Sequence, residues 1–136
     1  MTEPTERRVL LDTSVIIDPP PQGTASFADV VSVSAVTVGE LHYGVGASPD
    51  PIEQLHRRQR LRLVLDTYDV LPFDAAVAEF YGLLANVVRQ SGRDPRPRRL
   101  DLMIAATAVR HGFSLATRNG ADLRHLERVL AVIDVG

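Results

Sequence analysis

Short runs of almost continuous apolar residues alternate along the chain with segments in which apolar residues recur at helical spacing. A short apolar run bounded by turn residues is typical of a buried strand, whereas apolar positions at i, i+3, i+4 and i+7 indicate an amphipathic helix. The predicted strands occupy residues 9–17, which run into a turn, and residues 31–36, 70–73, 113–117 and 129–133. The predicted helices occupy residues 37 to 44 or 46, 51–68, 74–88, 100–110 and 120–126.

Strands that are apolar throughout, rather than alternating, are buried on both faces of a sheet. Because helices separate these strands, we expect an α/β fold with a mostly parallel central sheet of four to five strands and helices on both faces. Pro72 places the strand at 70–73 at an edge of the sheet. With 136 residues, 45% of them hydrophobic and 24% charged, the chain suits one domain over residues 1–136, of which 1–8 are expected to be flexible.

Composition narrows the location and the chemistry. No apolar stretch approaches the roughly 20 residues that span a bilayer, and residues 1–6 lack the basic and then apolar pattern of a signal peptide, so we expect a cytoplasmic protein. The chain has no cysteine, which excludes disulfides, thiolate nucleophiles and cysteine-ligated zinc.

Four acidic residues stand where a predicted strand gives way to a turn or where a predicted helix begins: Asp12, Glu40, Asp101 and Asp122. The carboxyl ends of parallel strands share one edge of a sheet, and ligands bind at that edge. This placement predicts that the four carboxylates lie together. Because crowded carboxylates repel one another, they favour a hard divalent cation such as Mg²⁺ or Mn²⁺.

Three of these acids have an alternative explanation at the start of a helix. Residues 37–40 fit a capping box that ends in the second acid, residues 119–122 fit a looser version of it, and Asp101 would be favoured by the helix dipole alone. Asp12 has neither a predicted helix to cap nor a basic neighbour in sequence, and burying an unpaired carboxylate is costly. Asp12 therefore favours metal binding as the interpretation of the whole set.

Four motifs follow one another between residues 9 and 123. They read LDTS at 11–14, ELHYG at 40–44, DLMIAATA at 101–108 and TRNGADL at 117–123. Together they resemble the ordered motifs of the PIN-domain ribonucleases, and within that family they are most similar to the VapC toxins of bacterial toxin–antitoxin pairs. One such motif is weak, whereas four in this order and at this chain length are specific.

The resemblance implies a metal pocket formed by all four acids and surrounded by hydrogen-bonding side chains. The residues implied in this surrounding shell are Thr13, Ser14, Thr117 and Asn119. The chain departs from many relatives at two places. Arg98 to Leu100 precede the third acid, where small or polar residues are common, and Leu123 follows the fourth, where Phe is common. Neither departure touches an acidic position.

Metal-assisted hydrolysis is the chemistry that fits these residues. The histidines, which we expect at the surface or at helix ends, have no metal-ligand spacing: they are His42, His56, His111 and His125. One or two Mg²⁺ or Mn²⁺ ions would lower the pKa of a bound water and stabilise charge on a phosphodiester. We assign Asp12 and Asp101 as principal ligands. Glu40 and Asp122 complete the set, and either one orients or deprotonates the attacking water.

All 15 basic residues are arginines. The net charge of −2 argues against a surface that is basic throughout and binds nucleic acid without specificity. Clusters at 57–62 and 93–99 have a simple interpretation as solvated surface. The second cluster leads into the third acid, and we expect it to contact the RNA backbone, so that replacing Arg98 and Arg99 with Ala flattens the salt dependence of RNA binding. The candidate RNA-contacting residues are Arg96, Arg98, Arg99 and Arg118. With 5% aromatic residues and no Trp, we expect recognition by shape and backbone rather than by an aromatic platform.

The resemblance also implies partners: an RNA substrate, a second copy of the chain in a homodimer, and a VapB-like antitoxin whose tail covers the acids, often with an arginine. A guanidinium pairs bidentately with carboxylates and so competes with a metal. Three alternatives stay open: a housekeeping PIN nuclease without an antitoxin, a non-catalytic RNA- or protein-binding module of the same fold, and a phosphatase-like or receiver-like domain. The phosphatases expect a second Asp where Ser14 stands.

Overall fold

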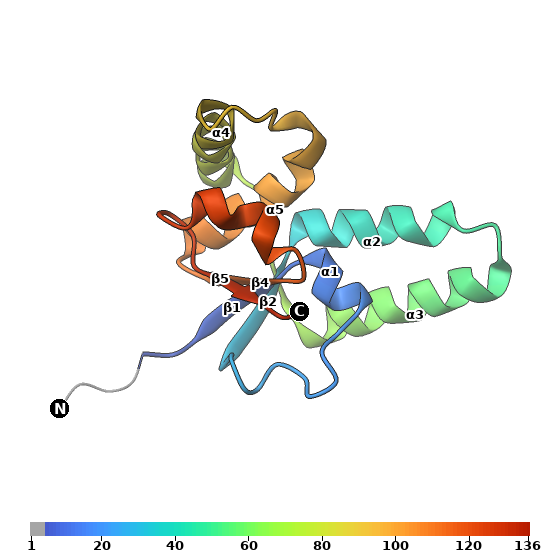
Figure 1. Ribbon diagram of the computed structural model, residues 1–136. Coiled ribbons are helices and arrows are strands. Elements are labelled where there is room, and N and C mark those ends of the chain that lie inside the picture. The colour runs from blue at the N-terminus through green and yellow to red at the C-terminus, as the bar shows by residue number, and fades with distance from the viewer. Residues whose placement is uncertain (1–4) are drawn as a thin grey trace.

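The computed structural model describes residues 5–136, which form a five-stranded sheet in the order β3-β2-β1-β4-β5 with all neighbouring strands parallel (Figure 1). The strands are β1 (Arg8–Leu11), β2 (Val30–Ser34), β3 (Asp69–Leu71), β4 (Ser114–Thr117) and β5 (Val132–Asp134). The helices are α1 (Thr13–Ile17), α2 (Ala35–Ala47), α3 (Pro51–Thr67), α4 (Ala75–Gln90) and α5 (Arg99–His111), with short 3-10 helices η1 (Arg96–Arg98) and η2 (Gly120–Leu126). The predicted α/β class and parallel sheet are confirmed.

Helices cover both faces of the sheet because successive side chains of each strand point to opposite sides. Leu10 and Leu115 pack in one core cluster with residues of α4, α5 and η2. Val9 and Leu11 pack in a second cluster with residues of α1, α2 and α3. Strands with a core on each side must be apolar throughout, which explains the pattern from which they were predicted.

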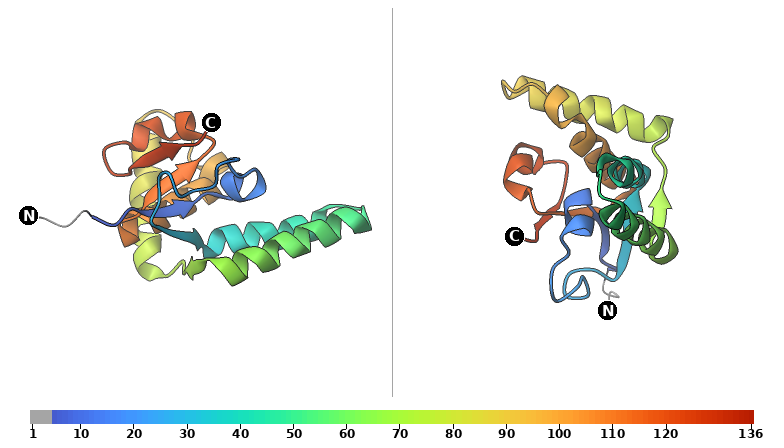
Figure 2. Two further views of the ribbon diagram at one scale, coloured as in Figure 1. Left: turned by 90° about the horizontal axis from the view of Figure 1, so that it is seen from below. Right: turned by 90° about the vertical axis from the view of Figure 1, so that its right-hand side faces the viewer.

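Helices α2 and α3 extend from the sheet as an antiparallel hairpin (Figures 1 and 2). Near the sheet, Leu41, Leu61 and Val64 are buried. Farther along the hairpin several large apolar side chains are exposed, among them Tyr43 at 80% and Ile52 at 66%. Part of the hairpin therefore belongs to the core, and part presents apolar surface to the outside.

The first two predicted strands end earlier than expected. The run at 9–17 stops at Leu11, and residues Thr13–Ile17 form helix α1 instead of a turn. The strand predicted at 31–36 ends at Ser34, whose hydroxyl accepts a hydrogen bond from the backbone N–H of Val36 at 3.0 Å and so caps α2. Ser caps a helix well. The helix therefore begins two residues before the predicted start.

The last strand begins later than expected. At Val129 and Leu130 the backbone N–H groups still donate to the carbonyl of Leu126, at 3.0 and 2.9 Å. These bonds continue the turn that follows η2, so that β5 starts at Val132 rather than at 129.

Other predicted boundaries agree closely with the structure. Asp74 caps α4 by accepting from the N–H of Val77 at 3.0 Å. Gly112 ends α5 with a φ of 72°, in the left-handed region that glycine adopts most easily. Strand β3, with Pro72 directly after it, is at an edge of the sheet.

The predicted flexible segment 1–8 includes residues 1–4, which lie outside the described residues. Of the rest, Arg7 forms an ion pair with Asp29 at 3.0 Å and Arg8 begins β1. Across residues 5–136, we find no helix that combines the length and the apolar character needed to cross a membrane.

Candidate active site

The candidate site lies where the order of the strands reverses. The chain builds β1, β2 and β3 towards one edge of the sheet and then returns to place β4 on the other side of β1. In open parallel sheets, the crevice outside the carboxyl ends of two such strands is the usual place for a ligand. Asp12 directly follows β1, and Thr117 is the last residue of β4.

Asp12 is buried, with 6% of its surface exposed, and several donors hold one of its oxygens. The hydroxyls of Ser14 and Thr117 donate to Oδ2 at 2.6 and 3.1 Å, and the backbone N–H of Ser14 lies 3.4 Å away. Asp12 is thus the N-cap of α1, contrary to the expectation that it had no helix to cap. Over residues 5–136, the hydrogen bonds made to this carboxylate all reach Oδ2. This arrangement fixes the side chain and leaves Oδ1 for another partner.

Glu40 lies inside α2, so its interpretation as part of a capping box at 37–40 is wrong. Its Oε1 accepts a hydrogen bond from the Thr13 hydroxyl at 2.9 Å, and the same hydroxyl lies 3.0 Å from Thr37 Oγ1. Burial raises the pKa of Glu40 above its ordinary value, the Thr13 hydrogen bond opposes this, and the charges of Asp101 and Asp12 raise the pKa further. Glu40 is therefore coupled to two of the other predicted site acids.

Asp101 occupies the first turn of α5. Its pKa is raised, first by burial, then by the charge of Asp12 and, more weakly, by that of Asp122, while Arg98 lowers it. Asp101, Asp12 and Asp122 line one small crevice, and Asp101 and Glu40 line a neighbouring depression. The crevice has a volume of ≈ 10 Å³, at the lower end of the roughly 10–15 Å³ that one water requires.

Asp122 lies in η2, and the looser capping box proposed for residues 119–122 does not form. Asn119 precedes η2 without making a side-chain hydrogen bond to it. Instead, the backbone N–H of Asn119 donates to Thr117 Oγ1 at 3.0 Å, and Thr117 in turn donates to Asp12. The four residues predicted to surround the acids thus divide: two donate directly to Asp12, Thr13 donates to Glu40, and Asn119 acts through its backbone.

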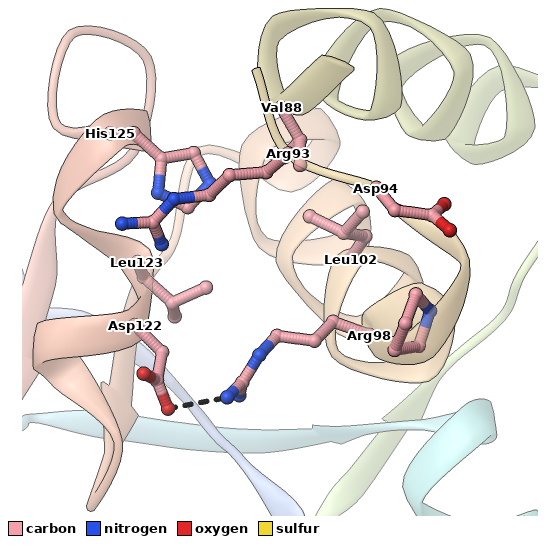
Figure 3. Close-up of a pocket in the computed structure, with 9 residues that line it drawn as sticks. Val88, Arg93, Asp94, Arg98, Leu102, Asp122, Leu123 and His125 are labelled. Carbon is pink, nitrogen blue, oxygen red and sulfur yellow. Dashed lines mark ion pairs between the residues drawn. The ribbon is translucent and has the colours of Figure 1, made fainter. Parts of the chain in front are cut away.

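Arg98 lies within ion-pair distance of two of the acids, Asp122 and Asp101. Its Nη1 lies 2.9 Å from Asp122 Oδ2, the ion pair drawn in Figure 3, and 3.7 Å from Asp101 Oδ2. Over residues 5–136, no three acidic or histidine side chains lie close enough together to ligate one ion. The donors have the right chemistry for a hard cation, since they are carboxylates that repel one another. With the Arg98 guanidinium beside them, two of these donors are paired with a protein cation.

The other predicted RNA-contacting arginines differ in their surroundings. Arg96 pairs with Asp94 at 3.0 Å on the surface. Arg118 is largely covered: its Nε donates to the carbonyl of Asp18 at 2.6 Å, and its backbone N–H donates to the Ser14 hydroxyl at 3.2 Å. Arg99 is exposed at the start of α5. The two exposed residues are freer to meet a ligand than Arg118.

One residue of interest was missed from the sequence. His125 was expected at the surface or at a helix end, but its ring lines a pocket beside Asp122, with Arg93 across from it (Figure 3). The spacing from Asp122 to His125 is i, i+3, which places both residues on one side of a helical turn. This spacing is visible in the sequence and could have placed His125 beside Asp122.

Comparison with known proteins agrees with this fold. The PIN domain family model matches residues 9–129, and the chain belongs to that family. It is 33% identical to toxin FitB of Neisseria gonorrhoeae, over 82% of this chain and 87% of FitB. It is 36% identical to ribonuclease VapC4 of Mycobacterium tuberculosis, over 83% of this chain and 87% of VapC4.

Solved structures give the same result. A crystal structure of VapBC-5 from Mycobacterium tuberculosis, a member of the VapBC family of toxin–antitoxin systems, aligns with a TM-score of 0.79 and 31% identity, over 93% of this chain and 96% of the other. The structure of FitAcB from Neisseria gonorrhoeae aligns with a TM-score of 0.77 and 30% identity, over 93% and 97% of the two chains.

Proposed function

We propose that this protein is a metal-dependent endoribonuclease that acts as the toxin of a VapBC-like toxin–antitoxin pair. The observation that carries the proposal is the placement of four acids near the carboxyl ends of β1 and β4: Asp12, Asp101 and Asp122 line one crevice, and Glu40 lines the depression beside it. Support comes from the relatives named ribonuclease VapC4 and toxin FitB. One or two Mg²⁺ or Mn²⁺ ions, held by Asp12 and Asp101 with Glu40 and Asp122, would supply a Lewis acid and activate a water.

The surroundings of each acid suggest different roles. Asp12 is the most firmly held, because three donors fix one of its oxygens, and it suits a constant ligand. Glu40 has a raised pKa and a Thr13 hydrogen bond that orients it. A carboxylate whose pKa is raised towards the working pH is a better proton acceptor, so we assign Glu40 to orient and deprotonate the attacking water.

The ion pair of Arg98 bears on both substrate and partner. A guanidinium fits between Asp101 and Asp122 in this chain. An arginine from an antitoxin tail would meet the same carboxylates, pair with them bidentately and compete with the metal. We propose that Arg98 leaves these acids when the metal is bound and turns to the RNA backbone, where Arg96 and Arg99 add further positive charge.

The exposed apolar side chains of α2 and α3 are the proposed docking surface for a VapB-like antitoxin. Relatives solved together with antitoxins, such as VapBC-5, support a partner of this kind. We also propose that the toxin is a homodimer, which light scattering of the purified chain tests directly.

The test of the proposed function is a cleavage assay on a mixed RNA pool and a matched DNA pool, with Mg²⁺ or Mn²⁺. We expect the parent chain to cut RNA and leave DNA intact, and Asp12→Ala to lose at least about 100-fold in rate, because a principal ligand is gone. Asp66→Ala, at an exposed position of α3, is the matched control and should cut like the parent. Equal cleavage by the parent and Asp12→Ala would refute the proposal, whereas binding of RNA without cleavage would favour a non-catalytic module.

A further inference from the structure

A larger pocket opens beside the acids, between the end of α4, the loop at 93–98, α5 and η2 (Figure 3). Its volume is ≈ 160 Å³. Arg98, Asp122 and Leu123 line both this pocket and the small acid crevice, so the two spaces are neighbours with a common wall. Any ligand in the pocket would lie next to the proposed site of chemistry. We call it the side pocket.

Apolar walls give the side pocket room for a flat ring. Val88, Leu102 and Leu123 contribute these walls, and each is at most 5% exposed because it is anchored in the core. An apolar cavity of about 150 Å³ is large enough to hold a benzene ring. The side pocket therefore suits a single six-membered ring better than a fused double ring.

One polar atom that lines the side pocket has no hydrogen-bond partner within the described chain: Nε2 of His125. Over residues 5–136, His125 Nε2 is one of two buried side-chain nitrogens with no hydrogen-bond partner. Burial lowers the pKa of His125, and the charges of Arg93 and Arg98 lower it further, which keeps the imidazole neutral near pH 7. A neutral imidazole offers one donor and one acceptor. His125 Nε2 can therefore make one hydrogen bond to a ligand: it donates to a carbonyl oxygen or, in the other tautomer, accepts from an N–H group.

The two arginines frame the same space. The side chain of Arg93 reaches across the pocket towards the His125 ring, and that of Arg98 reaches towards Asp122 (Figure 3). Asp94, in contrast, points away from the pocket in the same view and pairs with Arg96. A ligand would thus meet an apolar ring-sized space, an imidazole edge and two guanidinium groups. A nucleotide has a part that suits each feature: a base ring for the apolar space, polar atoms on the edge of the base for the imidazole, and a phosphate for the guanidinium groups.

We propose that the side pocket binds one unpaired pyrimidine base of the RNA, next to the phosphodiester at the acid site. The inference rests on the proposed function, because it places the base beside a scissile phosphate. Unpaired bases are held between side chains and recognised along their hydrogen-bonding edges. In the side pocket, the faces of the base would contact the aliphatic walls. Arg93 would move aside and stack on the base or pair with a phosphate. His125 Nε2 would form a hydrogen bond with the edge of the base.

Cleavage-site mapping on a mixed RNA pool tests the proposal. We expect the parent to prefer a pyrimidine at one position flanking the cut. His125→Phe keeps a ring but loses the nitrogen, and Arg93→Ala removes the guanidinium; each should reduce that preference by roughly tenfold, the effect of one lost hydrogen bond. Arg89→Ala removes a charge from the exposed end of α4 and is the matched control, since Arg89 does not line the pocket. It should keep the parental preference.

Binding of mononucleotides gives a readout that does not depend on cleavage. We expect CMP or UMP to shift the NMR signals of the His125 ring and of the Leu102 and Leu123 methyl groups in the parent, and AMP or GMP to do so less. His125→Phe and Arg93→Ala should weaken this binding and Arg89→Ala should not. If the parent cuts no RNA but these shifts occur, the side pocket binds a pyrimidine base and the proposed function falls.

Three results would overturn the inference and leave the nuclease assignment intact. The first is RNA cleavage with no base preference beside the cut. The second is a preference for purines, which contradicts the argument from size. The third is a pyrimidine preference that survives in both pocket variants; if those variants instead weaken only the binding of an antitoxin, a protein side chain occupies the pocket.

Discussion

Two of the site acids share a cationic neighbour, Arg98, which lies 2.9 Å from Asp122 and 3.7 Å from Asp101. Arg98 is half-exposed, and pairs of this kind contribute about 1 kcal/mol at most. Such a pair is weak enough for a divalent cation to displace and strong enough to influence how tightly that cation binds.

Arg98→Ala should bind Mn²⁺ more tightly than the parent, by up to about fivefold, because the ion no longer competes with the guanidinium. Isothermal titration calorimetry on the RNA-free protein measures this. Arg99→Ala removes the same charge one residue away, where the side chain is exposed and not paired with either acid, and it should change the affinity less. Equal affinities in the parent and Arg98→Ala would show that Arg98 does not compete with the metal.

Glu40 carries a prediction about pH. Its folded-state pKa is above the unfolded value, so the folded chain holds the proton more tightly, and this contribution to stability falls as pH rises through the two pKa values. Without metal, Glu40→Gln removes the buried charge and keeps an oxygen to accept from Thr13. It should therefore raise the free energy of unfolding at pH 7; the gain should shrink as pH falls through the raised folded-state pKa of Glu40 and be lost below roughly pH 4, where the carboxyl is protonated in both states.

Urea denaturation of both proteins in EDTA across this pH range checks the expectation. A gain that is constant with pH would show that the stabilisation does not come from the charge of Glu40. If Glu40→Gln were less stable than the parent at pH 7, the charged Glu40 carboxylate would be stabilised by its surroundings and not destabilised by burial.

At the residue scale, the sequence placed the four acids near one edge of the sheet, but it gave wrong reasons for several of them. Asp12 was singled out because it had no helix to cap, yet it does cap α1. Conversely, the capping alternatives for Glu40 and Asp122 fail, because Ser34 is the N-cap of α2 and Asn119 makes no side-chain cap bond to η2. The choice between capping and site roles depended on helix starts, which local sequence specifies only to within a few residues.

At the element scale, two glycines predict opposite effects of the same substitution: Gly112, at the end of α5, and Gly82, in the middle of α4. Gly112 has a φ of 72°, and a Cβ there would meet nothing closer than Arg8 Nη2 at 3.8 Å. Gly112→Ala should therefore cost about 1–2 kcal/mol through backbone conformation alone. Gly82 lies on the exposed side of α4 with no neighbour within 4 Å of a Cβ, and Gly82→Ala should stabilise by up to about 1 kcal/mol.

Chemical denaturation of the two variants beside the parent measures both effects. If Gly112→Ala were neutral, the left-handed end of α5 would not be needed. If Gly82→Ala were destabilising, that face of α4 would have to be covered by another chain, which would support the proposed homodimer.

Elements with a strong internal pattern were predicted well. The face of α4 that carries Val77, Leu84 and Val88 is buried, and its cap at Asp74 is confirmed. The boundary between β2 and α2 was misplaced because residues 31–36 are equally apolar on both sides of Ser34. Likewise, β5 was placed too early, since backbone bonds to Leu126 hold Val129 and Leu130 in a turn.

The whole molecule explains why four acids that are far apart in sequence come together. Strand order 3-2-1-4-5 puts the carboxyl ends of β1 and β4 side by side, and α2, α5 and η2 bring in the other acids. This juxtaposition was predictable, because carboxyl ends of parallel strands share an edge. The side pocket was not, because its walls come from α4, α5 and η2, whose packing no local pattern specifies.

The central claim is that these four carboxylates form one metal site that cuts RNA. The most direct test is the Mn²⁺ dependence of RNA cleavage, compared with the Mn²⁺ dissociation constant of the same preparation. The account predicts no cleavage in EDTA, half-maximal cleavage at a concentration close to the dissociation constant, and loss of both binding and cleavage in Asp12→Ala. Cleavage that persists in EDTA, or an Asp12→Ala variant that binds Mn²⁺ and cuts like the parent, would contradict it.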